Sequence, residues 1–205
     1  MQKRRAQVTT YYVNPEPCDV ILDIGCGDGY VSNHLLKAAS VVGLDTSIDS
    51  LLIAKRRIEC SNIELICADA AHLPFRQNSF NKVTALEVLE HLPEEAQKKV
   101  CHEANRILKE RGIFLISIPH GEQINADTHA RCGHLYSMDE KKVTDLLPSY
   151  YNLVTRCHLP NIGLVSLSTI LQRLPVESWL LLNSIFGQFH KGYWVLLKFE
   201  KMRMD

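Results

Sequence analysis

The first residues that could do chemistry form a glycine-rich turn directly after a short apolar run. Residues 20–30 read VILDIGCGDGY, with glycines at alternate positions and Asp23 just before them. Glycines permit a tight turn and let a ligand approach the backbone. Dinucleotide sites prefer the spacing GxGxxG, which places a pyrophosphate at a helix N-terminus, where Asp23 would repel it. Asp23 beside GxGxG instead favours a cationic ligand without phosphate; the alternative is a purely structural turn.

Acidic side chains follow the next three apolar runs. Asp45 could accept hydrogen bonds from both hydroxyls of a ribose, or it could cap the helix that follows. If that ribose belongs to an adenosine, Thr46 would lie beside the adenine. Asp69 could accept from the adenine amino group while the backbone N–H of Ala70 meets a ring nitrogen; the alternative is a polar turn. Glu87 ends the fourth run and would face the reactive end of the ligand.

Alternating apolar runs and helical segments must position these residues. Continuous apolar runs, typical of strands buried on both faces of a parallel sheet, occupy 20–24, 41–44, 63–67, 83–86 and 113–118. Helical spacing occupies 30–37, 47–58 and 93–109, with Pro93 expected at the first helical position and Gly112 expected to stop the last helix. A helix over 138–147 and strands over 151–158 and 193–200 follow. The order predicts a doubly wound α/β sheet, whose ligands bind beyond the carboxyl ends of the strands.

Four signals in this order resemble the class I S-adenosylmethionine-dependent methyltransferases, and within them the group that acts on small molecules. The signals are LDIGCGxG, the acid after the second run, Asp-Ala before LPF, and ExLEH, and they cover about residues 18–120. The resemblance implies a Rossmann-like, mostly parallel seven-stranded sheet with one antiparallel strand and helices on both faces. It implies S-adenosylmethionine as cofactor, with its methionine end at the glycine turn. The predicted cofactor-binding residues are Asp23, Gly25, Cys26, Gly27, Asp45, Thr46, Asp69, Ala70 and Glu87.

The expected reaction is a direct displacement, because a sulfonium is already an activated methyl donor. The protein must align the acceptor with the methyl group and exclude water. A general base is needed only if the acceptor loses a proton. His120 and His134 are the candidate catalytic bases, since they lie in the polar segment 119–138 that should cover the site, as does His129. Tyr136 could instead line the acceptor pocket.

A metal site is the second chemical interpretation of the same region. Glu87, Glu90 and His91, with His134, resemble the ligand set of metal-dependent relatives such as ubiquinone-pathway O-methyltransferases and small-RNA 2′-O-methyltransferases. ExLEH also occurs in members not known to use metal, where Glu90 and His91 would brace the start of a helix. We therefore predict no metal.

The predicted function is methyl transfer to O, N or C of a small-molecule or lipid- or glycan-like acceptor. The alternatives are a non-catalytic interaction module with the same fold and a metal-dependent RNA 2′-O-methyltransferase. Lys plus Arg equals Asp plus Glu at 23 each, so the net charge is zero, which argues against a nucleic-acid partner. A nicotinamide oxidoreductase is disfavoured because GxGxxG is missing.

The chain is expected to form one domain over 1–205. Residues 1–120 would bind the cofactor, and 121–137 and 159–190 would form a substrate-side loop and helices. The apolar residues 166–186, within the second of these ranges, could pair two copies of the chain or simply pack on the fold. No stretch reaches the roughly 18 uninterrupted apolar residues that a membrane-spanning helix needs. Seven cysteines without CxxC spacing suggest reduced thiols and a cytoplasmic protein. The basic residues 3–5 are expected to form a solvated helix end.

Overall fold

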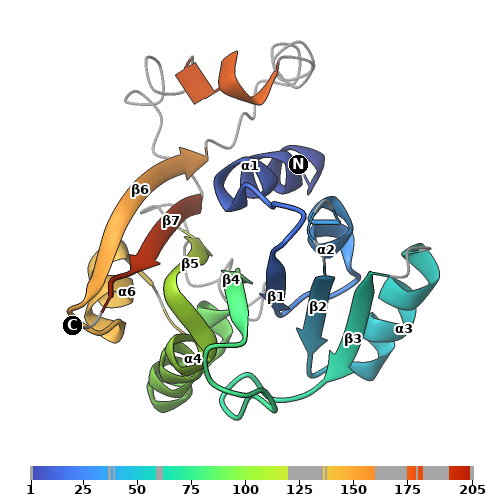
Figure 1. The fold of residues 1–205 in the computed structure, drawn as a ribbon, viewed down its shortest axis with the longest axis horizontal. Coiled ribbons are helices and arrows are strands. Elements are labelled where there is room, and N and C mark those ends of the chain that lie inside the picture. The colour runs from blue at the N-terminus through green and yellow to red at the C-terminus, as the bar shows by residue number, and fades with distance from the viewer. Residues whose placement is uncertain are drawn as a thin grey trace.

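The fold is a seven-stranded sheet with helices on both faces (Figure 1). The computed structural model describes residues 2–36, 38, 40–58, 62–119, 136, 138–159, 175–178, 180–181 and 194–203. The strands are β1 (Val20–Ile24), β2 (Ser40–Asp45), β3 (Ile63–Cys67), β4 (Phe80–Leu86), β5 (Leu108–Pro119), β6 (Tyr151–Leu159) and β7 (Trp194–Lys201). The helices are α1 (Gln2–Val13), α2 (Tyr30–His34), α3 (Ile48–Arg57), η1 (Leu89–His91), α4 (Glu94–Ile107) and α6 (Glu140–Leu146).

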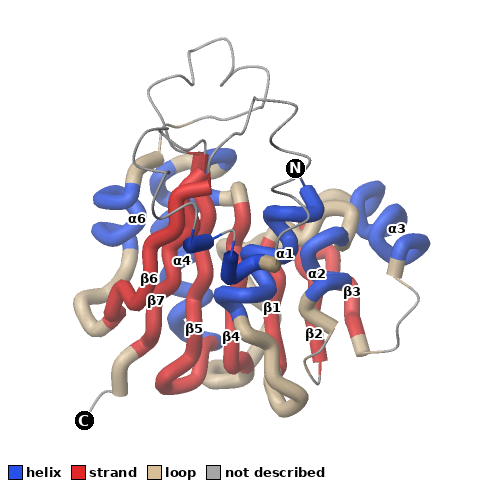
Figure 2. Tube along the Cα trace, turned by 90° about the horizontal axis from the view of Figure 1, so that it is seen from above, coloured by secondary structure: helices blue, strands red, loops and turns tan. Residues whose placement is uncertain are grey.

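The strand order across the sheet is β3-β2-β1-β4-β5-β7-β6, which can be followed from one edge to the other in Figure 2. β7 is antiparallel to both β5 and β6, and the other pairings are parallel. The predicted doubly wound sheet with one antiparallel strand is therefore confirmed. Because the strand order reverses between β1 and β4, the carboxyl ends of these two strands form the switch point at which such sheets bind ligands.

The direction of winding decides which face each helix covers. The chain moves outward from β1 to β3 through α2 and α3, and outward in the opposite sense from β4 to β5 through α4. Right-handed crossovers therefore place α2 and α3 on one face and α4 on the other. Figure 1 shows this arrangement, with α1 beside α2 and α6 beside α4.

Two apolar clusters fill the space between the sheet and its helices. Alternate residues of each central strand enter opposite clusters: Leu22 of β1 packs on the α4 side and Ile21 on the α1 and α2 side. Val100 and Ala104 of α4 and Val143 of α6 are fully buried in the larger cluster. Burial of both faces explains why the central strands are continuous apolar runs.

Strand β3 departs from that expectation. Ile63–Cys67 was predicted as a strand buried on both faces, but Glu64 and Cys67 are exposed and the other three residues are only partly buried. The physical reason is its position at the edge of the sheet. Its bounds agree with the sequence prediction.

The fourth helix also differs from its prediction. Pro93 is the N-cap of α4, one position before the first helical residue. The helix ends at Ile107 because Leu108 takes an extended conformation and begins β5. Gly112 therefore does not stop the helix; it lies inside β5, where a Cβ would come within 2.8 Å of the Leu108 side chain. Ser47 caps α3 as predicted, with its side chain accepting a hydrogen bond from the Ser50 N–H.

Only a small part of the apolar C-terminal segment falls within the described residues. Val176 and Leu180 are partly buried and pack against the core cluster on the α1 side, while Leu181 is 62% exposed. Two of these side chains thus pack on the fold itself. Among the helices of the described ranges, none combines the length and the hydropathy that crossing a lipid bilayer requires.

Candidate functional site

A pocket opens at the carboxyl ends of β1 and β4, where the strand order reverses. It is lined by Arg5, Asp23, Gly25, Cys26, Gly27, Asp28, Tyr30, Val31, Leu86 and Glu87. Five of the nine residues predicted to bind a cofactor thus share one pocket, namely Asp23, Gly25, Cys26, Gly27 and Glu87. The other four lie elsewhere along the same edge of the sheet.

The glycine turn has the backbone that only glycine adopts readily. Gly25, Gly27 and Gly29 all have positive φ, at 68°, 53° and 73°. The N–H of Gly25 donates to the Leu44 carbonyl at 2.7 Å, which holds the turn against β2. A Cβ on Gly29 would lie 2.6 Å from the Ile58 side chain, whereas a Cβ on Gly27 would meet no atom within 4 Å. Gly29 therefore packs against the fold, and Gly27 faces open space.

Asp23 is the most deeply buried acid of the pocket, with 2% of its surface exposed. Its carboxylate accepts hydrogen bonds from Ser32 Oγ at 2.5 Å and from Thr84 Oγ1 at 2.6 Å. Burial raises the pKa of Asp23, and these two hydrogen bonds and the positive charge of Arg5 oppose that rise. The pocket thus contains a carboxylate that a cationic ligand would stabilise.

Asp45 joins the glycine turn to the following helix. Its Oδ2 accepts from the Gly27 N–H at 2.8 Å and its Oδ1 from the Ser47 N–H at 2.9 Å. The helix cap itself belongs to Ser47, so the capping alternative for Asp45 is wrong. Each carboxylate oxygen can accept more than one hydrogen bond, and Asp45 is partly exposed, so its acceptor capacity is not exhausted.

The residues predicted to hold the adenine lie at the ends of β2 and β3. Cys67 Sγ lies 3.5 Å from the Thr46 carbonyl and links these two strand ends. Asp69 accepts from the Ala71 N–H at 2.8 Å, so it forms the polar turn that was the alternative interpretation. This hydrogen bond, first among the causes, lowers the pKa of Asp69. Its side chain is 60% exposed, which leaves the carboxylate accessible to a ligand.

Glu87 has a strained backbone at the end of β4. Its φ of 57° is unusual for a residue with a side chain, and such strain tends to persist at functional sites. The Ser117 hydroxyl donates to Glu87 Oε1 at 2.7 Å and fixes the carboxylate. The conformation turns the chain sharply from β4 into the region of η1.

Glu90 of η1 is a fully buried carboxyl group whose two oxygens have no hydrogen-bond partner. Burial, followed by the negative charge of Glu87, raises its pKa to about 8. The backbone carbonyl of Glu90 accepts from the Tyr136 N–H at 3.2 Å, which places Tyr136 against η1. Within the described ranges, no three His, Cys, Asp or Glu side chains are grouped so that they could hold a metal ion. His134 lies outside those ranges, so the four-ligand set is not tested.

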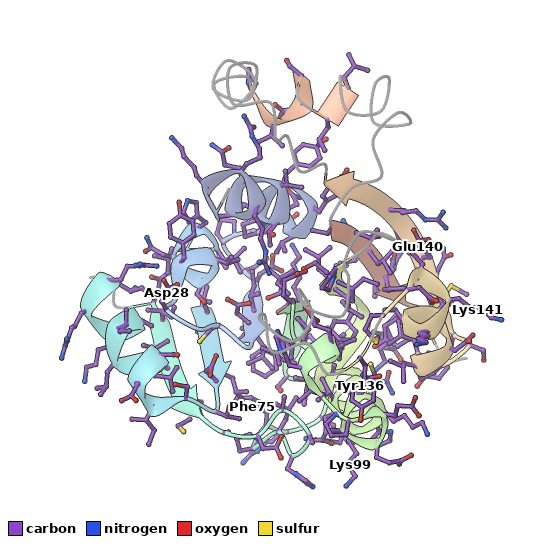
Figure 3. The ribbon with its side chains drawn as sticks, turned by 180° about the vertical axis from the view of Figure 1, so that it is seen from behind. Asp28, Phe75, Lys99, Tyr136, Glu140 and Lys141 are labelled. Carbon is purple, nitrogen blue, oxygen red and sulfur yellow. The ribbon has the colours of Figure 1, made fainter. Side chains whose placement is uncertain are left out.

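Arg5 is the site residue that sequence reasoning missed. Residues 3–5 were expected to form a solvated helix end, but Arg4 is only 9% exposed and Arg5 lines the pocket. Arg5 is the basic side chain among the lining residues and lies among Asp23 and Glu87. A second basic residue, Arg57, contacts two residues that line the pocket: it forms an ion pair with Asp28 at 2.6 Å and lies over the Tyr30 ring. Figure 3 labels Asp28 on the loop beside α3.

The candidate bases His120 and His134, and His129, lie outside the described residues. The structure therefore leaves their role as a prediction.

The chain is similar in sequence to a family of methyltransferase domains and to individual methyltransferases. Residues 21–112 match the family model of a methyltransferase domain. The chain is similar to a probable S-adenosylmethionine-dependent methyltransferase of Mycolicibacterium smegmatis, with 30% identity over 62% of this chain and 49% of that protein. It is also similar to the demethylmenaquinone methyltransferase of Thermotoga maritima, with 32% identity over 61% of this chain and 51% of that protein. The chain thus spans about half the length of these curated relatives.

A solved structure shares the fold. The N-methyltransferase NodS of Bradyrhizobium japonicum, in complex with S-adenosylhomocysteine, has a TM-score of 0.69 over 98% of this chain and 87% of that chain. Its sequence identity is 15%, so this likeness concerns the fold alone.

Proposed function

We propose that this chain, whose residues 21–112 match a methyltransferase domain, is a class I S-adenosylmethionine-dependent methyltransferase that transfers the methyl group of its cofactor to a small-molecule acceptor. The methionine end of the cofactor would occupy the pocket between β1 and β4. The ribose would bind Asp45, and the adenine would lie between the ends of β2 and β3 near Thr46, Asp69 and Ala70.

One observation carries the proposal: the pocket combines acidic side chains with a glycine turn whose backbone is open to a ligand, and the cofactor has cationic groups that acidic side chains would bind. Asp23 and Glu87 line it beside a turn whose Gly27 faces open space. S-adenosylmethionine has a sulfonium, an ammonium and a carboxylate but no phosphate. Arg5, on the same wall, is suited to the carboxylate, and the acids are suited to the two cations. The residues that line the pocket therefore fit S-adenosylmethionine.

The cofactor supplies an activated methyl group when it is bound. The chain's own residues then have to orient the donor and exclude water from the displacement. Ser117 fixes Glu87, and Ser32 and Thr84 fix Asp23, so the charges next to the donor are held in place before binding. Such preorganisation reduces the cost of rearrangement during the reaction.

The proposed acceptor is a small molecule, with O, N or C as the methylated atom. The Thermotoga maritima relative, named a demethylmenaquinone methyltransferase, supports an acceptor of this class. The zero net charge of the chain disfavours nucleic acid. We propose that residues 1–120 bind the cofactor and that the segments 121–137 and 159–190 shape the acceptor side.

The test is calorimetric titration of S-adenosylhomocysteine and S-adenosylmethionine into wild type, Asp45→Ala and Asp45→Asn. We expect Asp45→Ala to weaken binding at least about tenfold, because it removes the acceptor for two ribose hydroxyls. Asp45→Asn retains one side-chain oxygen and should lose less. The matched control is Asp49→Ala, because Asp49 is an exposed acid in the first turn of α3, four residues after Asp45.

Unchanged affinity in Asp45→Ala, or the absence of binding to wild type, would contradict the proposed site. Transfer of a labelled methyl group to a small-molecule fraction of cell extract tests catalysis. If a folded, cofactor-binding protein labels no compound in any fraction, the non-catalytic alternative is favoured.

A further inference from the structure

The connector between β3 and β4, residues 68–79, contains no regular helix or strand, yet it carries two of the residues assigned to the adenine. Buried backbone polar groups in such a segment need hydrogen-bond partners. Near Asp69 some of these partners are local, since the N–H groups of Ala71 and His72 both donate to Asp69. Further along the connector the partners are on α4, the helix that covers the neighbouring part of the sheet. Figure 3 labels Phe75, which marks the middle of this connector beside α4.

Two side chains of α4 bind the connector backbone. Arg106 donates from Nη1 to the Phe75 carbonyl at 2.7 Å and from Nη2 to the Leu73 carbonyl at 3.0 Å. Glu103 Oε2 accepts from the Leu73 N–H at 2.8 Å. All three contacts are to backbone atoms, so they fix the path of the chain rather than the identity of its side chains.

The same two side chains are fixed by each other. Arg106 Nε donates to Glu103 Oε1 at 2.7 Å, and Arg106 Nη2 donates to Glu103 Oε2 at 2.8 Å. A two-pronged pair of this kind has a defined geometry, unlike a contact through a single ammonium. Both side chains are also partly shielded, with 31% of Arg106 and 15% of Glu103 exposed. The pair is therefore a preformed clamp.

The far end of the connector is bound to the last turn of α4 as well. The Asn78 N–H donates to the Arg106 carbonyl at 3.1 Å, and the Ser79 N–H donates to the Ile107 carbonyl at 2.8 Å. On the N-terminal side of Asp69, the Ala68 N–H donates to the Asp45 carbonyl at the end of β2, at 3.1 Å. The turn of Asp69 therefore lies between two attachments, the one at Ala68 and the clamp at Leu73, which is four residues further along the chain. The clamp fixes the C-terminal side of that turn.

We propose that Glu103 and Arg106 are positioning residues for recognition of the adenine base, acting through the backbone at Leu73 on Asp69 and Ala70. The inference rests on the proposed function, which assigns the adenine to this connector. Hydrogen bonds to a base edge require donor and acceptor to be placed within a few tenths of an ångström. Release of the connector therefore reduces selectivity for the base before it reduces stability of the core.

The test compares two ligands that differ only in the base, S-adenosylhomocysteine and S-inosylhomocysteine. Inosine replaces the amino group of adenine with a carbonyl, which cannot donate to the Asp69 carboxylate. Affinities are measured by calorimetry for wild type, Arg106→Met and Arg106→Lys. Lys98→Met is the matched control, because Lys98 forms an i,i+3 ion pair with Glu95 on the same helix and is exposed.

In wild type we expect S-adenosylhomocysteine to bind at least about tenfold more tightly than S-inosylhomocysteine. Arg106→Met should lower the first affinity about tenfold and leave the second nearly unchanged, so that the preference for adenine is lost. Arg106→Lys keeps the charge beside Glu103 but cannot reach both carbonyls, and it should lose part of the preference. Lys98→Met should retain it.

Equal losses for both ligands in Arg106→Met and Arg106→Lys would overturn the inference, because a general loosening of the fold weakens both complexes alike. An unchanged preference in Arg106→Lys and Arg106→Met would overturn it too. If wild type binds neither ligand, the proposed function itself fails. If Arg106→Met does not fold, the partial loss in Arg106→Lys decides the question.

Discussion

Wild type should lose stability as the pH rises toward 8, and Glu90→Gln should lose much less. In the folded protein this carboxyl group is buried without a hydrogen-bond partner, and its pKa is raised from 4.5 to about 8. Below the lower value the group is protonated in both the folded and the unfolded chain. Above it, the unfolded chain ionises while the folded one does not, so ionisation favours unfolding until the pH passes about 8.

The magnitude follows from the size of the shift. A difference of one pKa unit is equivalent to about 1.4 kcal/mol, so the whole shift corresponds to an upper limit of about 5 kcal/mol. Between about pH 5.5 and about pH 7.5, wild type should lose about 2.5 kcal/mol relative to Glu90→Gln. For a chain of this size that difference is about 5 to 10 °C in melting temperature.

The assay is thermal or urea unfolding of both proteins at the two pH values, with the double difference as the measured quantity. Any fixed cost of burying the glutamine amide cancels in this difference. Glu64→Gln, at an exposed position of β3, is the control and should follow wild type. Parallel pH profiles for wild type and Glu90→Gln would refute the reasoning, since the carboxyl would then ionise alike in both states.

Two further predictions concern the glycine turn and a buried ion pair. Gly29→Ala should lower the free energy of unfolding by about 2 kcal/mol or more, because its Cβ would lie 2.6 Å from Ile58 Cδ1 and 2.9 Å from the Cβ of Ala54, which has no flexible side chain to move away. Gly27→Ala, with open space at its Cβ, should cost about 1 kcal/mol and mainly weaken binding of the proposed cofactor. Equal melting temperatures of the two variants would contradict this. Lys82→Met should cost about 3 kcal/mol in chemical denaturation by leaving Asp19 unpaired, since Lys82 Nζ lies 2.5 Å from its carboxylate and both side chains are mostly buried. The double variant Lys82→Met/Asp19→Asn should recover much of the stability lost in Lys82→Met. If the stability loss of the double variant equals the sum of the two single losses, the two side chains do not stabilise each other.

Much of the site could be predicted because its signals are local. The glycine spacing, Asp23 and the strand ends occur within short stretches of chain, and the parallel sheet brings successive strand ends to one edge. The bounds of β1 and β3 agree with the predicted runs, although only β1, which lies inside the sheet, is buried on both faces. Burial on both sides requires uninterrupted apolar residues, and that requirement is visible without the structure.

The contribution of Arg5 could not be predicted, because it depends on how α1 docks. Ala6 and Val8 are fully buried, and their packing turns Arg5 into the pocket formed by residues far along the chain. A triplet of basic residues at a helix start gives no local sign of that. The clamp of Glu103 and Arg106 is similar: an i,i+3 pair on a helix usually indicates only a surface ion pair.

The position of β7 has a consequence for the order in which the chain can fold. In the described sheet, β6 pairs only with β7, and β7 stands between it and β5. Residues 151–159 therefore cannot join the sheet on the ribosome until residues 194–201 have emerged. The pocket at the carboxyl ends of β1 and β4, by contrast, is lined by residues no later than Glu87. Synthesis can thus complete all the residues that line this pocket while β6 still waits for β7, and deletion of β7 should leave β6 detached from the sheet.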